Sequence, residues 1–182
     1  MAEIYRIGSD DIVDRVSKFS GVNILTNSKG EFTGTIPSSS CNDFKVWNSI
    51  VTVNPGEIWT LSFEAKAATA GSKMNSYFYN NSSNIVQASS CRSSIGTTTC
   101  GGDGGITWTL TTSYIKYWVT WFFNTGAAAT KNCIVGRALS GTNNGTTITV
   151  KNPKLEKGTK PTDWTPAPQD LVTVSGTELQ FF

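Results

Sequence analysis

The feature that most constrains this chain is a period-two alternation of apolar and polar residues in segments rich in β-branched and aromatic residues. Between residues 58 and 66, Trp59, Leu61, Phe63 and Ala65 alternate with Thr, Ser, Glu and Lys. Successive side chains of a strand point to opposite faces, so the first set is expected in a core. A helix would instead repeat its apolar residues about every 3.6 positions. The alternation therefore predicts half-buried β-strands.

Clusters of Gly, Asn, Ser and Pro divide the chain into short strands. At Asn54–Pro55–Gly56, Pro55 presets φ and Gly56 supplies a positive φ, as a type II turn requires. We predict strands over residues 22–26, 44–53, 58–66, 74–79, 84–89, 106–111, 114–123, 132–139 and 146–155. So many short antiparallel strands predict an all-β fold, a two-sheet antiparallel β-sandwich of the jelly-roll kind.

Composition is consistent with one β domain. The 182 residues are enough for a single core that needs neither a metal nor disulfides to fold. Charged residues make up 15% and the net charge is +2, without a run of like charges, so nothing supports nucleic-acid binding. No apolar run approaches the roughly 20 residues that cross a bilayer. The first residues lack the apolar core of a signal peptide, so synthesis in a cytoplasm is expected.

Residues 1–20 differ in character from the rest. Ser9 can cap a short helix that begins at Asp10 and ends before Gly21. Its single apolar stripe consists of Ile12, Val13, Val16 and Phe19. Such a short helix is marginal in water, so the stripe needs a partner, either the chain's own sandwich or a neighbouring subunit. We divide the chain into an N-terminal helical arm (1–20), a sandwich (21–170) and a C-terminal extension (171–182).

The alternation also points several large aromatic side chains outward, where they require a reason. Sugar rings offer apolar faces that stack on aromatic residues, while their hydroxyls need fixed polar partners, and an outer sheet face can supply both. The candidate saccharide-binding residues are Tyr77, Tyr79, Trp118, Lys116, Asn75, Glu64 and Trp47, the last being equally suited to a core. The alternative is that the N-terminal arm, a long loop or an oligomer partner covers these aromatics.

The residues that most catalytic sites need are missing or scattered. The chain has no His, which excludes Ser-His-Asp and Cys-His groups, and its 13 Asp and Glu form no evident pair, so we expect no enzyme. The four cysteines lack the CxxC spacing of zinc sites. Cys91 and Cys100 flank a loop of hairpin length and are a candidate disulfide, whereas Cys133 lies in an apolar strand and is expected to be free.

The last predicted strand runs into the phrase ITVKNPKLEKGTKPTDWTPAPQD, residues 148–170. This phrase resembles the ending of carbohydrate-binding-module-like jelly rolls in tail, baseplate and fibre proteins of bacteriophages. The segments GVNILTNSKGEF (21–32), NPGEIWTLSFEAKA (54–67) and ITWTLTTSYIKYWVTW (106–121) resemble other parts of that family in the same order. The resemblance covers residues 21–170, and Trp164 is expected to anchor the end of the domain.

The resemblance implies a location and a function. It implies a non-enzymatic virion protein, made in the bacterial host cytoplasm, that binds host cell-surface polysaccharide, contacts other phage structural proteins and forms an oligomer in the particle. The alternative is a structural decoration, collar or connector protein whose aromatic face is buried by protein. A binding domain of a polysaccharide-degrading enzyme fits the fold but not the tail phrase. The resemblance requires no cofactor, but such jelly rolls often hold a structural Ca²⁺, for which Glu31 and Asn152 are the matching region.

Overall fold

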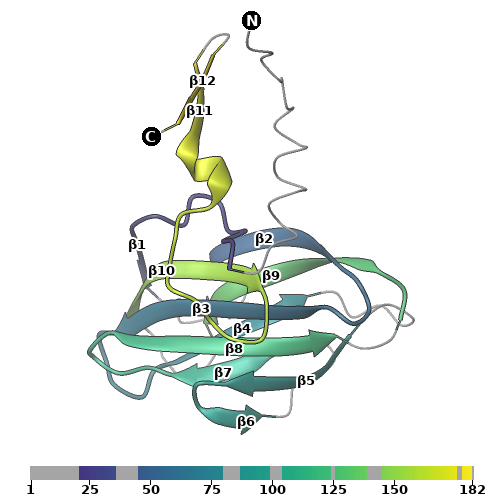
Figure 1. Ribbon diagram of the computed structural model, residues 1–182. Helices are drawn as coiled ribbons and strands as arrows, with labels where there is room; N and C mark the ends of the chain where they lie inside the picture. The colour runs from purple at the N-terminus through teal and green to yellow at the C-terminus, as the bar shows by residue number, and fades with distance from the viewer. Residues whose placement is uncertain are drawn as a thin grey trace, which may run out of the picture.

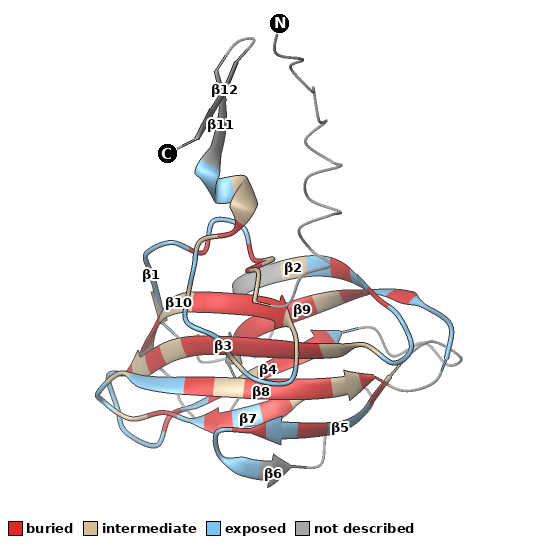
Figure 2. Ribbon diagram, viewed as in Figure 1, coloured by how far each residue is buried: buried red, intermediate tan, exposed pale blue. Residues whose placement is uncertain are grey.

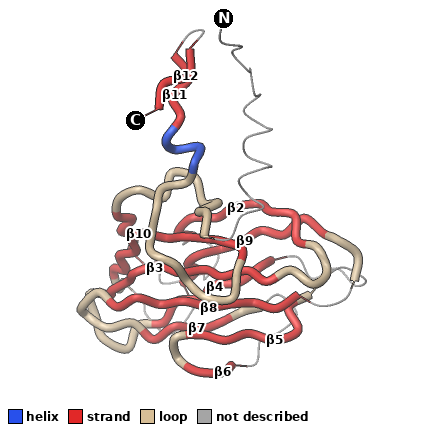
Figure 3. Tube along the Cα trace, viewed as in Figure 1, coloured by secondary structure: helices blue, strands red, loops and turns tan. Residues whose placement is uncertain are grey.

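A computed structural model of the chain describes residues 21–35, 45–79, 87–98, 104–123, 126–138, 145–175 and 178–181. Most of these residues form two antiparallel sheets that pack face to face, and the last of them form a separate two-stranded hairpin (Figure 1). Strands and loops make up nearly all of the described chain, with one short 3-10 turn (Figure 3). The predicted all-β, two-sheet antiparallel sandwich is therefore confirmed. The predicted N-terminal helical arm lies outside the described residues.

The larger sheet has six strands and the smaller has four. The order in the six-stranded sheet is β1 (Glu31–Thr35), β10 (Thr147–Lys157), β3 (Ile58–Ala67), β8 (Ile115–Phe123), β5 (Ala88–Ser93) and β6 (Gly96–Thr98). The order in the four-stranded sheet is β2 (Lys45–Val53), β9 (Ala129–Ala138), β4 (Lys73–Tyr79) and β7 (Ile106–Thr109). After the sandwich follow the 3-10 turn η1 (Pro168–Leu171) and the hairpin strands β11 (Val172–Ser175) and β12 (Glu178–Phe181).

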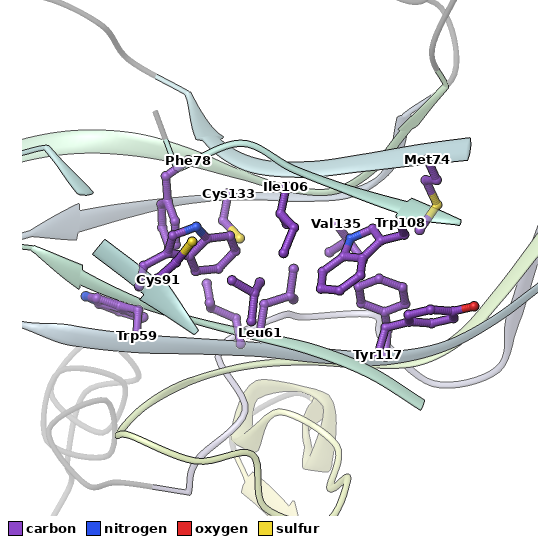
Figure 4. Close-up of a cluster of buried hydrophobic side chains, with 14 of the residues drawn as sticks. Trp59, Leu61, Met74, Phe78, Cys91, Ile106, Trp108, Tyr117, Cys133 and Val135 are labelled. Atoms are coloured by element: carbon purple, nitrogen blue, oxygen red, sulfur yellow. The ribbon is translucent and has the colours of Figure 1, made fainter. Parts of the chain in front are cut away.

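The core lies between the sheets and combines aliphatic side chains with large aromatic ones (Figure 4). Phe78 of β4 meets Trp121 of β8 edge to face, with ring centroids 4.8 Å apart. Phe63 of β3 meets Trp108 of β7 in the same way at 5.7 Å. These contacts join one sheet to the other. The predicted inward set of 58–66, Trp59, Leu61, Phe63 and Ala65, is confirmed, since all four side chains are buried.

Two strand predictions need correction. Residues 22–26 do not form a strand. The buried side chain of Asn23 makes hydrogen bonds to backbone groups that a neighbouring strand would otherwise make. Its amide and carbonyl groups hydrogen-bond Ser28 Oγ, the carbonyls of Pro153 and Thr165, and the amides of Leu25 and Leu155. Of the strand predicted at 84–89, residues 84–86 lie outside the described residues, Gln87 is not in a strand, and β5 runs from Ala88 to Ser93. The sequence also gave no warning of β1 or of the early start of β9 at Ala129.

A segment that we call the C-terminal belt, residues 158–167, crosses the outer face of the six-stranded sheet (Figure 1). At its start, the hydroxyl groups of Thr60 and Thr120 donate hydrogen bonds to the carbonyls of Gly158 and Thr159 at 2.8 and 3.5 Å. Near its end, Trp164 Nε1 donates a hydrogen bond to the Pro153 carbonyl at 3.2 Å. The belt therefore covers part of a face that strand alternation alone would leave exposed.

Under the belt lies an ion pair between Lys154 and Glu156, whose side chains are each 1% exposed. Lys154 Nζ donates to Thr162 Oγ1 at 2.6 Å and to the Asp163 carbonyl at 2.8 Å, while the Glu156 carboxylate accepts from the amide and hydroxyl of Thr162. Desolvation lowers the pKa of Lys154, and the charge of Glu156 opposes that shift. The residues Lys-Leu-Glu and Thr-Asp-Trp of the tail phrase thus hold the belt on the sheet.

Candidate functional site

The predicted saccharide-binding residues divide between the two sheets. Asn75, Tyr77 and Tyr79 lie on β4 of the four-stranded sheet. Glu64 on β3 and both Lys116 and Trp118 on β8 lie on the six-stranded sheet. Because the sheets pack through their inner faces, these two groups point away from each other. The expectation of one surface shared by Tyr77, Tyr79 and Trp118 is therefore wrong. Trp47 lies on β2, and its side chain is outside the described part of the structure.

The outer surface of the four-stranded sheet, which we call the four-stranded face, carries Ile50, Asn75, Tyr77, Tyr79, Asn132 and Arg137. Ile50 and Tyr79 are 70% and 57% exposed, the highest values for large hydrophobic residues in the described chain. Both pair in register with Asn132 on the intervening strand β9. Neighbouring strands lie about 4.8 Å apart, so Ile50, Asn132 and Tyr79 form a row about 10 Å long across the face.

Asn132 lies at the centre of this row. Its Oδ1 is buried and has no hydrogen-bond partner in the described part of the chain. A buried acceptor without a partner is unfavourable, and most such atoms in folded proteins have one. A hydroxyl or amide group of a ligand lying between Ile50 and Tyr79 would supply the missing donor.

The aromatic residues of the four-stranded face are held in place by neighbours. Tyr77 is 5% exposed, and its Oη accepts a hydrogen bond from Arg137 at 2.9 Å. The Arg137 guanidinium also lies 5.8 Å from the centroid of the Tyr77 ring. Tyr77 meets Tyr79 edge to face at 6.2 Å. Asn75 Oδ1 accepts a hydrogen bond from Thr107 at 2.7 Å. Tyr79 is thus an exposed ring braced by a buried one, flanked by oriented polar groups.

The outer surface of the six-stranded sheet has a different chemistry where the belt leaves it uncovered. Glu64 accepts a hydrogen bond from Asn152 Nδ2 at 2.9 Å and pairs with Lys151 at 3.5 Å. The ammonium groups of Lys66 and Lys151 lie 4.5 and 4.1 Å from the centroid of the Tyr114 ring. Trp118 is only half-buried, as its outward position predicts. This surface is a network of charges rather than an apolar strip.

The region proposed for calcium belongs to this network. Desolvation raises the pKa of Tyr114 to about 12, and the negative charges of Glu31 and Glu64 act in the same direction. Asn152 has a φ of 53° at the irregularity in β10 and turns its amide nitrogen to Glu64, whereas calcium is bound by oxygen atoms. Among the described residues, no group of three or more His, Cys, Asp or Glu could hold a metal ion. The calcium site at Glu31 and Asn152 stays a prediction.

The cysteines fall into two kinds. Cys91 is disulfide-bonded. Its partner lies outside the described residues, as Cys100 does, so the pairing of Cys91 with Cys100 stays a prediction. Cys133 is free and buried in the core, and burial raises the pKa of its thiol far above the ordinary value. The Cys133 thiol is therefore protonated and inert at neutral pH.

Sequence reasoning missed three residues of the four-stranded face. Ile50 could have been found. Val51 and Val53 mark the inner face of β2, and Ile50 lies an odd number of residues from both, so it faces outward. Asn132 and Arg137 could not, because only the register of β9 against β2 and β4 brings them beside Ile50, Tyr79 and Asn75.

Across the described chain, no helix is both long and apolar enough to pass through a membrane.

Comparison with known proteins gives structural likeness only. No protein-family profile and no curated protein sequence matches the chain. The fold is similar to a chain of the tripod (BppUct-A-L) from the baseplate of bacteriophage Tuc2009, with 17% identity, a TM-score of 0.43 and 82% of this chain covered. The match spans 59% of that baseplate chain.

A second similar structure is the N-terminal cellulose-binding domain of β-1,4-glucanase C from Cellulomonas fimi. The identity is 17%, the TM-score is 0.41, and the match covers 78% of this chain and 88% of that domain. At these values the likeness to both structures concerns the arrangement of strands and not their ligands.

Proposed function

We propose that this chain is a non-catalytic virion β-sandwich whose four-stranded face binds a saccharide on the host cell surface. The observation that supports this most is the row of Ile50, Asn132 and Tyr79. It combines the two most exposed large hydrophobic side chains of the described molecule with a buried acceptor that lacks a partner. An exposed apolar surface with a few fixed polar groups is the usual composition of a site for a small ligand.

Each residue of the row has a distinct role in this proposal. The ring of Tyr79 stacks on the C–H face of a sugar, and Tyr77 limits its movement, so little side-chain entropy is lost on binding. Asn132 Oδ1 accepts a hydrogen bond from a sugar hydroxyl. Ile50 covers the far side of the ligand two strands away. Asn75 and Arg137 border the row and are already oriented by Thr107 and Tyr77.

The proposed location in a phage particle rests on the tail phrase. The structure gives that phrase a folding role, since Lys154, Glu156, Thr162 and Trp164 hold the C-terminal belt on the sheet. The resemblance of this phrase to the ending of phage jelly rolls is the reason to group this chain with them. Host polysaccharide and other phage structural proteins are accordingly the proposed partners, within an oligomer of the virion.

Binding of the purified chain to a glycan array and to host cell-wall polysaccharide tests the proposal. Tyr79→Ala should weaken binding about tenfold or more, equivalent to roughly 1.4 kcal/mol. Asn132→Ala should weaken it as well. Trp118→Ala, on the opposite side of the sandwich, is the matched control and should bind as the unaltered chain does.

Two results would contradict this assignment. Loss of binding in Trp118→Ala but not in Tyr79→Ala would move the site to the six-stranded sheet. Failure of the unaltered chain to bind any saccharide would favour the structural alternative, in which protein contacts within the particle bury the four-stranded face.

A further inference from the structure

The two apolar side chains of the row on the four-stranded face have different shapes. Tyr79 is flat and aromatic, so it suits the C–H face of a sugar ring. Ile50 is branched and aliphatic, and it is the most exposed large hydrophobic residue of the described chain. A sugar ring that lies on Tyr79 and carries hydroxyl groups alone brings no apolar atom to Ile50, which is one strand beyond Asn132. Ile50 therefore indicates a second apolar group in the ligand, separate from the ring.

Asn132, which lies between these two residues, narrows the kind of donor. Its Oδ1 is buried and has no hydrogen-bond partner in the described part of the chain. A hydroxyl group that donates to Oδ1 also has acceptor lone pairs of its own, which would then lie between two apolar side chains. An amide N–H only donates, so it supplies the missing hydrogen bond and brings no unpaired acceptor. The position beside Asn132 thus favours an amide over a hydroxyl.

An acetamido group on a sugar ring has these features in the order of the row. Its N–H is attached directly to the ring, and its methyl group lies beyond, on the same side of the trans amide as the N–H. Tyr79, Asn132 and Ile50 follow one another in the same order, each about 4.8 Å from the next. Tyr79 and Ile50 are mainly exposed, and exposed side chains change rotamer quickly, so a ligand can approach Oδ1 between them.

We propose that the saccharide bound by the four-stranded face contains an N-acetylated amino sugar. Its ring lies on Tyr79, its amide N–H donates to Asn132 Oδ1, and its acetyl methyl group packs on Ile50. The acetyl carbonyl is on the opposite side of the amide and stays in water. This inference rests on the proposed function, and it replaces the sugar hydroxyl beside Asn132 by an acetamido group.

Two tetrasaccharides that differ at one position of each ring test the inference. The β-1,4-linked tetramers of N-acetylglucosamine and of glucose have the same rings, linkages and length, and they differ in the acetamido group that replaces a hydroxyl. Isothermal titration of the unaltered chain should give an affinity about tenfold higher for the acetylated tetramer, the usual effect of a small apolar group with a matching contact.

Substitutions on the four-stranded face should separate the ring from the acetyl group. Ile50→Ala should remove most of the preference by weakening binding of the acetylated tetramer alone. Tyr79→Ala should weaken binding of both tetramers by similar factors, because both present a ring to it. Thr52→Ala is the matched control, since Thr52 is also exposed on β2, and it should change neither affinity. Thermal denaturation reports that each variant is folded.

The possible failures of the two proposals can be told apart. Equal affinity of the unaltered chain for both tetramers, or a preference that Ile50→Ala leaves intact, would overturn the N-acetyl inference. Binding to host polysaccharide with neither tetramer bound would overturn it as well, and in all three cases the proposed function would stand. Absence of binding to every saccharide tested would overturn both.

Discussion

The two outer faces of the sandwich differ both in their side chains and in how far they are covered. On the six-stranded sheet the belt covers Lys154 and Glu156, which are almost completely buried (Figure 2). On the four-stranded sheet Tyr79 and Ile50 remain exposed. The irregularity between Lys151 and Lys154 turns Lys154 and Glu156 to the side of β10 opposite the buried Leu155, so all four residues lie on an outer face. The direction of a side chain says nothing about which segment passes over that face. Long polar side chains can thus be part of the interior while large apolar ones remain available to a ligand.

The comparison depends first on which side of each strand faces inward. Trp121 is fully buried, contacts Phe78 and donates a hydrogen bond to the Gly104 carbonyl at 2.6 Å. Trp121→Ala should lower the free energy of unfolding by about 3–5 kcal/mol. Trp118→Ala, on the outer side of the same strand, should cost about 1 kcal/mol. Urea denaturation of both variants measures the difference, and a reversed order would show that β8 is inside out.

The covered and uncovered parts of the six-stranded face can be compared through two ion pairs. Glu156→Gln leaves the charge of Lys154 buried without its counterion, and should cost about 3 kcal/mol. Glu64→Gln breaks the pair with Lys151, whose side chains are 34% and 27% exposed, and should cost less than about 1 kcal/mol. Equal losses in thermal or chemical denaturation would mean that the belt does not exclude water from Lys154.

Acid should affect stability through Glu57, which directly precedes β3 of the same sheet. Burial raises the pKa of Glu57, but hydrogen bonds from Lys157, Asn54 and Trp59 outweigh it and hold the pKa below the ordinary value of 4.5. The stabilisation by Glu57 is therefore complete above pH 4.5 and is lost as the pH falls through its lowered pKa. The unfolding free energy of Glu57→Gln should fall less steeply in acid than that of the unaltered chain. Parallel pH profiles would contradict this.

The smallest change in stability is expected on the exposed face. Tyr79→Ala and Ile50→Ala should alter the free energy of unfolding by about 0.5 kcal/mol or less, because both side chains are mainly in water. Between about pH 5 and 8, saccharide binding should also remain constant, since the chain has no His, the side chain whose ordinary pKa lies in this range. A loss of several degrees in melting temperature on Tyr79→Ala would indicate that this ring is packed against protein.

The sequence could predict which side chains of a strand face inward, because this depends on the local pattern. It could not predict which strands lie beside one another in a sheet. The inner face of β3 followed from alternation, because a strand repeats every two residues wherever it lies. The assignment of Tyr79 and Trp118 to different sheets depends on which strands are neighbours, and no local signal encodes that. The error at residues 22–26 has a similar origin. Asn23 satisfies backbone groups near residues 153 and 165, and one polar side chain in an apolar segment does not reveal such distant partners.

The place of β10 between β1 and β3 affects how the chain can be made. β1 has no partner until residues 147–157 have been synthesised, and Asn23 must wait for Thr165, which is 142 residues away. At about 5–20 residues per second, a ribosome takes on the order of 10–30 s to reach Lys157. During that time β1 and β3 both present unpaired strand edges, which are prone to pair with other chains. The nascent protein should therefore depend on chaperones until its last sandwich strand emerges, and premature termination before β10 should yield aggregates rather than a smaller folded domain.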